Sequence, residues 1–192
     1  VVVSVGSADG AVATASPGTL TFTPANYAVA QTVTLTGTPD ADAANGATSL
    51  SLTAVGATAA TVTVTVTDDD VLGIETSAGS LTIGEAGTGT VGVRLTAQPA
   101  GTTVVAIASS DTAAATVTAS LSFTTANWNV YQNATVAGVN DPDVASELVT
   151  LTLTSGTLPM KTVGVTVTDD DTLGIVTTAS AVALGEAGTA TF

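Results

Sequence analysis

Three consecutive aspartates occur twice in this chain, each time at the end of a run of alternating threonine and valine. Residues 65–70 and residues 166–171 both read Thr-Val-Thr-Asp-Asp-Asp. Adjacent carboxylates repel one another and favour turns over strands, so a chain that repeats them in place is expected to give them a shared counter-charge. Ca²⁺ suits such a cluster, because it takes about six to eight hard oxygen ligands and tolerates irregular geometry. The triplets therefore predict a divalent-cation site, with calcium as the leading candidate.

The rest of the chain repeats with the same offset of 101 residues. Gly-Glu-Ala-Gly-Thr occurs at 84–88 and again at 185–189, and no gap is needed from about residue 20 onward. A unit of this length is about the size of one immunoglobulin-like sandwich. The positions of the Asp triplets within the chain indicate that the sequence is a window from a longer repetitive protein. We expect three units: the C-terminal part of a first sandwich at 1–70, a complete sandwich at 71–171, and the first strands of a third at 172–192.

Short runs with a period of two occur along the whole chain and predict β-strands. In residues 61–67 and 149–154, one face of the strand is aliphatic and the other carries hydroxyl groups, as in a sandwich whose apolar faces point inward. No segment shows a convincing helical pattern. We therefore expect an all-β fold of tandem, antiparallel, immunoglobulin-like sandwiches. Aromatic residues are few, so the large packing residues are expected to be Phe22, Phe123, Tyr27 and Trp128.

The charge of the chain limits its partners. It has 16 acidic residues against two basic ones, Arg94 and Lys161, for a formal net charge of −14. Nucleic acids and anionic lipid surfaces are therefore not expected as partners, because both are bound through Lys and Arg. Apolar runs are too short and too often broken to insert into a membrane. Because the chain has no Cys and no His, thiol and imidazole chemistry are excluded, and no visible base could activate a Ser or Thr. We expect no enzyme.

Four features together resemble the Calx-beta family, a sandwich module found in sodium/calcium exchangers, in an integrin tail and in arrays within bacterial surface proteins. They are an early strand ending in Gly84-Glu85, a Leu-x-Phe strand at 121–123 followed by Trp128, an acidic loop around Asp141, and a last strand ending in the Asp triplet. In calcium-binding members, the early Glu, the acidic loop and the Asp run build a cation site at one pole.

Carried over to this sequence, the resemblance implies candidate calcium ligands in each repeat. In the complete repeat they are Glu85, Asp141, Asp143, Glu147, Asp169, Asp170 and Asp171, and in the first repeat they are Asp40, Asp42, Asp68, Asp69 and Asp70. Glu186 would belong to a third site, and Gly46 stands where Glu147 does. Only Asp9, Glu75 and Asp111 lie outside these positions, and this clustering favours calcium. The alternative is that the Asp runs simply end strands and keep sheet edges from pairing.

The combined pattern predicts a non-enzymatic structural array of an extracellular, cell-surface protein, such as an adhesin stalk or a filament. Its partners would be neighbouring repeats, with calcium stiffening the inter-domain joints. Three alternatives stay open. One is a module that binds a carbohydrate or another cell-surface ligand, and another is a regulatory calcium sensor. The third is a subunit that assembles head to tail into a fibre, because the tail carries the early strands that the head lacks.

Overall fold

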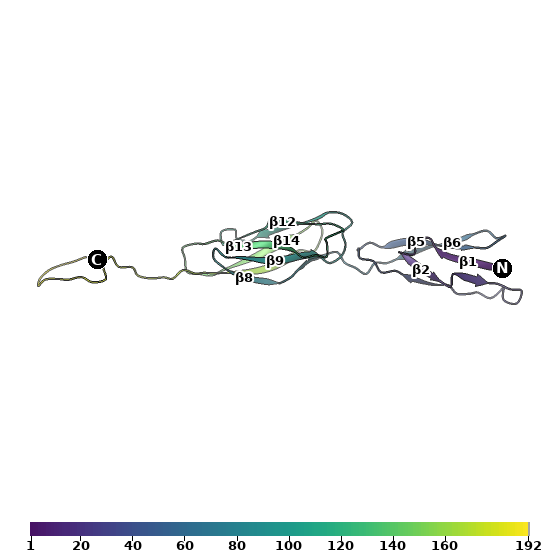
Figure 1. Cartoon of the computed structure of the whole chain (residues 1–192), viewed down its shortest axis with the longest axis horizontal. Coiled ribbons are helices and arrows are strands. Elements are labelled where there is room, and N and C mark those ends of the chain that lie inside the picture. Colours follow the sequence, from purple (N-terminus) through teal and green to yellow (C-terminus); the bar gives the residue numbers. More distant parts are fainter. Residues whose placement is uncertain (192) are drawn as a thin grey trace.

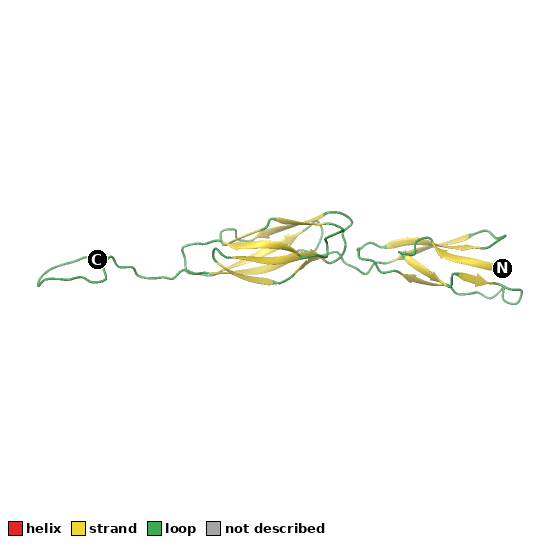
Figure 2. Cartoon of the chain, viewed as in Figure 1, coloured by secondary structure: helices red, strands yellow, loops and turns green. Residues whose placement is uncertain are grey.

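The computed structural model describes residues 1–191, which form strands and loops in one elongated body (Figure 1). The strands gather in two groups, followed by a C-terminal segment without strands, and the two termini lie at opposite ends of the molecule (Figure 2). Within the described part of the chain, there is no helix of the length and apolarity that a membrane crossing requires. The predicted all-β fold class is confirmed.

Nine strands make up the second repeat, residues 71–171. They are β7 (Ile74–Thr76), β8 (Ser80–Gly84), β9 (Thr88–Leu95), β10 (Thr103–Ser109), β11 (Ala115–Val117), β12 (Ser120–Phe123), β13 (Gln132–Gly138), β14 (Glu147–Thr154) and β15 (Lys161–Thr168). Five strands form one sheet in the order β12-β10-β14-β15-β8, and four form the other in the order β11-β13-β9-β7. All neighbouring strands are antiparallel except β15 and β8, which run parallel.

The two sheets of the second repeat share one hydrophobic core. Phe123, Val105 and Val163 of the five-stranded sheet are fully buried against Val93 and Val136 of the four-stranded sheet. Alternation of aliphatic residues with Thr or Gly places every second side chain of β14 from Val149 and of β15 from Val163 in this core. The second repeat is therefore a two-sheet β-sandwich, and its core joins residues that are far apart in the sequence.

The first repeat, residues 1–70, has six strands at the positions that the 101-residue offset predicts from β10 to β15. They are β1 (Val2–Ser7), β2 (Ala13–Ser16), β3 (Thr19–Thr21), β4 (Thr34–Gly37), β5 (Gly46–Thr53) and β6 (Ala60–Val66). One sheet has the order β3-β1-β5-β6, and the other contains only β2 and β4. Its core cluster has only three buried residues, Val5, Leu20 and Leu50. Counterparts of β7, β8 and β9 are absent from residues 1–70.

Two strands, β2 and β11, were not predicted from the sequence. Both are short, contain small residues, and follow an aspartate turn in which Asp9 or Asp111 accepts a hydrogen bond from the amide two residues later. Their pairing with β4 and β13 holds them in place, which a local sequence pattern does not reveal.

Tyr27 is not the buried packing residue that the sequence predicts. Trp128 packs against the core of the second repeat, and its carbonyl accepts a hydrogen bond from Leu95 N at 2.8 Å. Tyr27, at the equivalent position, is 75% exposed. Residues 1–70 contain no counterpart of the strand that carries Leu95, so nothing in them covers Tyr27.

The C-terminal segment, residues 172–191, also differs from expectation. The sequence predicts the first strands of a third repeat there, but the described residues form none. A strand needs a neighbouring strand for its backbone groups, and nothing in residues 1–191 pairs with this segment.

Candidate metal centre

Glu85 follows β8 directly and is fixed by the strand beside it. Its amide donates to the carbonyl of Thr168, the last residue of β15, at 3.0 Å. The chain then reverses in a tight turn, in which Gly87 N donates to Gly84 O at 3.0 Å and Ala86 has a φ of 52°. These contacts place the side chain of Glu85 beside the point where the Asp triplet begins.

Gly138 brings the acidic loop to the same place. Its amide donates to the carbonyl of Gly87 at 2.9 Å, which joins the end of β13 to the turn after Glu85. A Cβ atom at position 138 would lie 2.5 Å from the carbonyl oxygen of Gly84, so only glycine allows this approach. The residues after Gly138 therefore enter the acidic loop alongside Glu85.

The acidic loop and the Asp triplet are shaped by aspartate turns. Asp143 N donates to Asp141 Oδ1 at 3.0 Å, and Asp171 N donates to Asp169 Oδ1 at 2.8 Å. Ser146 links the two segments, because its Oγ accepts a hydrogen bond from Asp169 N at 3.2 Å. Aspartate side chains commonly stabilise turns in this way. The turns leave the second oxygen of each carboxylate free for another partner.

This arrangement brings five of the seven predicted ligands of the second repeat together. One oxygen each of Glu85, Asp141 and Asp169 lie within 4.8 Å of one another, and the same holds for Asp141, Asp143 and Glu147. Asp141 belongs to both groups. Asp170 and Asp171 belong to neither group and are exposed.

Glu85 is the most unusual member of the cluster. It is only 6% exposed, and both of its carboxylate oxygens are buried without a hydrogen-bond partner among the described residues. One oxygen each of Glu147 and Asp169 is in the same situation. Buried carboxylates without partners are costly and call for a compensating charge.

The pKa values of the buried glutamates are shifted in the direction that disfavours their charged forms. Burial raises the pKa of Glu85, the nearby backbone of Asp141 lowers it, and the carboxylates of Asp141, Asp169 and Glu147 raise it further. Burial likewise raises the pKa of Glu147, with added repulsion from Asp141 and Asp143. Arg94 pairs with Glu75 at 2.9 Å rather than with any of these groups. The cluster therefore concentrates negative charge without a basic side chain to balance it.

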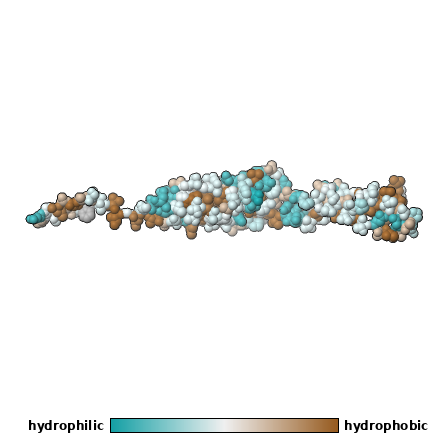
Figure 3. Space-filling view, turned by 60° about the horizontal axis from the view of Figure 1, so that its bottom comes forward, coloured by the Kyte–Doolittle hydropathy of each residue, from teal (hydrophilic) through white to brown (hydrophobic). Residues whose placement is uncertain are grey.

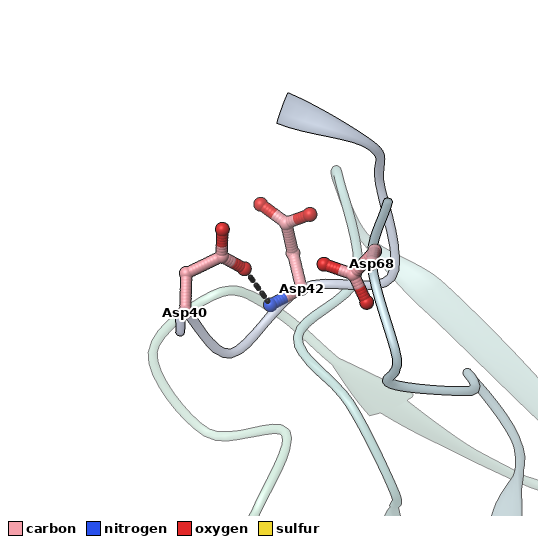
Figure 4. Close-up of side chains that lie close together, drawn as sticks. All are labelled: Asp40, Asp42 and Asp68. Atoms are coloured by element: carbon pink, nitrogen blue, oxygen red, sulfur yellow. Dashed lines mark hydrogen bonds between the residues drawn. The ribbon is translucent and has the colours of Figure 1, made fainter. Parts of the chain in front are cut away.

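The first repeat contains a reduced version of this cluster. Figure 4 shows Asp40 and Asp42 on one loop and Asp68 on the segment after β6, with one oxygen of each within 4.8 Å of the others. The turns are the same: Asp42 N donates to Asp40 Oδ1 at 3.0 Å, and Asn45 takes the place of Ser146. Asp69 and Asp70 lie outside the group.

Two differences separate the first cluster from the second. Gly46 supplies no carboxylate where Glu147 stands in the second repeat, and a Cβ atom there would lie 2.9 Å from Cγ1 of Val12, which would have to shift. No buried glutamate stands beside Asp68 within residues 1–70. Glu186 lies in the exposed C-terminal segment and is not part of any of these groups.

The acidic loop of the first repeat also contacts the second repeat. Asp42 and Gln98 form an isolated parallel β-bridge, and Gln98 N donates to the carbonyl of Ala41. Asp42, Leu72, Gln98 and Thr125 line a pocket at this junction. The sequence analysis did not single out Gln98, because a backbone contact between repeats leaves no residue-type signal.

Comparisons with known proteins do not assign a family to this chain. No protein-family model matches the chain, and no curated protein matches it, so the Calx-beta resemblance stays a prediction from its motifs. Solved structures of surface layer protein SbsC are similar: domains 1–6 at 21% identity and a TM-score of 0.46, over 88% of this chain and 20% of that one. Domains 4–9 match at 21% identity and a TM-score of 0.46, over 90% of this chain and 23% of that one. The chain thus spans about a fifth of these proteins, and the likeness concerns the fold alone.

Proposed function

We propose that this chain is part of a non-enzymatic structural array at the cell surface, an adhesin stalk or a filament, whose repeats are stiffened by Ca²⁺ at their joints. The observation that carries the proposal is Glu85, whose two buried oxygens have no partner among residues 1–191 and lie within a group of carboxylates. A hard divalent cation is the counter-charge that suits such a group of oxygens.

The candidate ligands come from the start, the middle and the end of one repeat. Glu85 follows β8, Asp141 follows β13, and Asp169 follows β15, just before the chain leaves for the next repeat. A cation held by these three groups would fix the exit of the chain relative to the body of the sandwich. Without it, the carboxylates repel one another at the exit, and the joint loosens.

Protection of sheet edges accounts less well for the same residues. Charges that prevent edge pairing act from the surface, as the exposed Asp170 and Asp171 can. Glu85 is buried and lies between segments that are already joined by hydrogen bonds. An edge-protecting role gives no reason to bury a carboxylate there, so a cation site is the better explanation.

The experiment that tests the proposal uses the full chain and two neighbouring aspartates. Trp128 is the only tryptophan and packs against the core of the second repeat, so its fluorescence follows the unfolding of that repeat. We expect calcium to raise the thermal midpoint relative to excess chelator, and Asp169→Asn to abolish most of this rise. Asp170→Asn, one residue away and outside the cluster, is the matched control and should keep it. Equal midpoints with and without calcium in the unmodified chain would refute the cation site.

A further inference from the structure

Tyr131 and Asn133 distinguish the second repeat from the first. The positions 101 residues earlier hold Ala30 and Thr32, whereas the residue between them is glutamine in both repeats. The side chains of Tyr131 and Asn133 are both exposed, that of Tyr131 by 41%. Residues that the repeats share can serve the fold that they share, but these two side chains need another explanation.

Both residues belong to a group of side chains on the outer face of the four-stranded sheet. Tyr131 stands directly before β13, and Asn133 alternates along β13 with residues of the core. Asn133 pairs with Gly92 of β9, and Arg94 follows two positions later on the same face. Glu75 of β7 pairs in turn with Arg94. We call the side chains of Glu75, Arg94, Tyr131 and Asn133 the Tyr131 patch.

The ring of Tyr131 is held in one orientation by its neighbours. Its hydroxyl donates to Glu75 Oε1 at 2.7 Å, and the guanidinium carbon of Arg94 lies 4.9 Å from the ring centroid. Arg94 is itself fixed, because its Nε and Nη2 donate to Glu75 Oε2 at 3.1 and 2.9 Å. A Cβ atom at Gly92 would lie 3.1 Å from Cδ1 of Tyr131, so the missing side chain there makes room for the ring. A ring that is already fixed loses little freedom when a ligand binds.

The rest of the surface is different in character. Arg94 is the only arginine of the chain, and Tyr131 is one of two tyrosines. On the opposite sheet, the outward positions of β10, β14 and β15 carry only uncharged residues, mostly Thr and Ala. Figure 3 shows strongly hydrophilic side chains gathered in a few places on the face that it draws, with residues of intermediate hydropathy over most of the rest. The Tyr131 patch thus combines side chains that are rare elsewhere on this molecule.

The chemistry of the patch suits a neutral saccharide. A sugar ring has apolar C–H groups that pack against an aromatic ring, and hydroxyl groups that both donate and accept hydrogen bonds. The amide of Asn133 can do both, and Nη1 of Arg94 makes no hydrogen bond within residues 1–191. Glu75 already neutralises Arg94, and the chain has a net charge of −14, so an anionic ligand is disfavoured.

We propose that the Tyr131 patch binds a neutral saccharide, with the sugar ring against Tyr131 and its hydroxyls bonded to Arg94 and Asn133. Stabilisation of the sheet explains the pair of Glu75 and Arg94, but it gives no role to the exposed amide of Asn133. The binding function is additional to the structural role and does not rest on the calcium site. Tyr131 precedes β13 and the acidic loop follows it, so the two sites lie roughly 20 Å apart along this strand.

An NMR titration of the full chain with saccharides tests the proposal. The neutral probes are cellopentaose, chitopentaose and mannopentaose, and trigalacturonic acid is the anionic comparison. Each is added up to about 10 mM, so that weak binding is detected. We expect at least one neutral probe to shift the side-chain N–H signals of Arg94 and Asn133. The proposal is overturned if no neutral probe shifts them, or if the anionic probe shifts them equally.

Substitutions on one strand face locate the bound sugar. Asn133→Ala changes an exposed side chain, so the chain stays folded, and loss of one hydrogen bond should weaken binding about fivefold. Thr135→Ala, two positions further on the same face of β13, is the matched control and should bind as the unmodified chain does. Equal affinities of these two variants would refute the assignment.

Tyr131→Ala introduces the residue type that the first repeat has at this position, and it should abolish binding. Because it also uncovers Gly92, the backbone spectrum of the variant is compared with that of the unmodified chain. The titration is repeated in excess chelator, where the affinity of the unmodified chain should not change. Binding that is lost in chelator would place the sugar at the calcium cluster and contradict the proposal.

Discussion

The amide of Gln98 donates a hydrogen bond of 2.6 Å to the carbonyl of Ala41, and this bond joins two different repeats. Ala41 lies between Asp40 and Asp42, two members of the acidic group of the first repeat. The loop that carries these carboxylates is thus held by its own aspartate turns on one side and by the next repeat on the other. This loop is therefore a point of contact between the two repeats.

Gln98→Pro is expected to loosen the joint between the repeats, because proline has no N–H to donate to Ala41. The lost bond contributes about 1 kcal/mol, which is enough to let the repeats move but too little to unfold either. Small-angle X-ray scattering should show a broader distribution of interatomic distances for Gln98→Pro than for Gln98→Ala, since both variants lose the side-chain bond to the carbonyl of Thr125. Gln98→Ala keeps the amide and is the control. Identical scattering from the two variants would argue against a role for this bond.

Glu85→Gln is expected to act in opposite directions with and without calcium. In chelator, it removes a buried negative charge from a cluster of like charges, so the thermal midpoint should rise above that of the unmodified chain. In calcium, the variant lacks a ligand and should show little further increase. Thermal unfolding followed by Trp128 fluorescence measures both effects. A lower midpoint in chelator would indicate that Glu85 has a stabilising structural role that does not need a cation.

Gly138→Ala is expected to destabilise the second repeat. The new methyl group would lie 2.5 Å from the carbonyl oxygen of Gly84, and relief of this overlap should cost about 1 to 3 kcal/mol. Urea unfolding followed by Trp128 fluorescence measures the change in free energy. Gly164→Ala in β15 is the control, because a Cβ atom there meets nothing within 4 Å. Equal effects of the two substitutions would show that the turn after Glu85 shifts to accept the methyl group at little cost in free energy.

Glu75 should contribute to stability in a pH-dependent way. The Tyr131 hydroxyl, which donates to Glu75 Oε1 at 2.7 Å, and the Arg94 guanidinium hold the pKa of Glu75 below its ordinary value of 4.5. For a lowered pKa, the stabilisation is present above the unfolded-state pKa and is lost as the pH falls through the folded-state pKa. The difference in unfolding free energy between the unmodified chain and Glu75→Gln should therefore shrink in acid.

An NMR titration of the Glu75 carboxyl carbon tests the cause of this shift directly. Tyr131→Phe removes the hydroxyl that contributes most, so the pKa of Glu75 should move up toward 4.5, while the pair with Arg94 stays in place. If the titration of Glu75 is the same in both proteins, the hydroxyl does not control it.

The sequence was sufficient for much of this architecture, because the relevant signals are local and repeated. Alternating Thr and Val predict β6 and β15, and the 101-residue offset relates β10–β15 to β1–β6. The short strands β2 and β11 escaped prediction, since their pairing partners rather than their own residues define them.

The candidate site was predictable in its residue types but not in its geometry. Three adjacent aspartates look equivalent in a sequence, yet the side chain of Asp169 lies in the cluster, and those of Asp170 and Asp171 are exposed. The direction of each side chain depends on the turn that Asp169 itself makes with Asp171 N. The contribution of Gly138 was also hidden, because it arises from a close approach to Gly84, which lies far away in the sequence. That calcium occupies the site stays a prediction.

The pairing of β8 with β15 also sets the order of events in folding. The hydroxyl of Thr168 donates to the carbonyl of Ile83, a residue 85 positions earlier. Strand β8, near the start of the repeat, therefore pairs only once β15, the last strand, is present. Closing such a distant contact is slow, and an incomplete repeat exposes a free strand edge in the meantime. A chain synthesised from its N-terminus cannot complete the sandwich of residues 71–171 before β15 is available, so β8 has no strand to pair with until then.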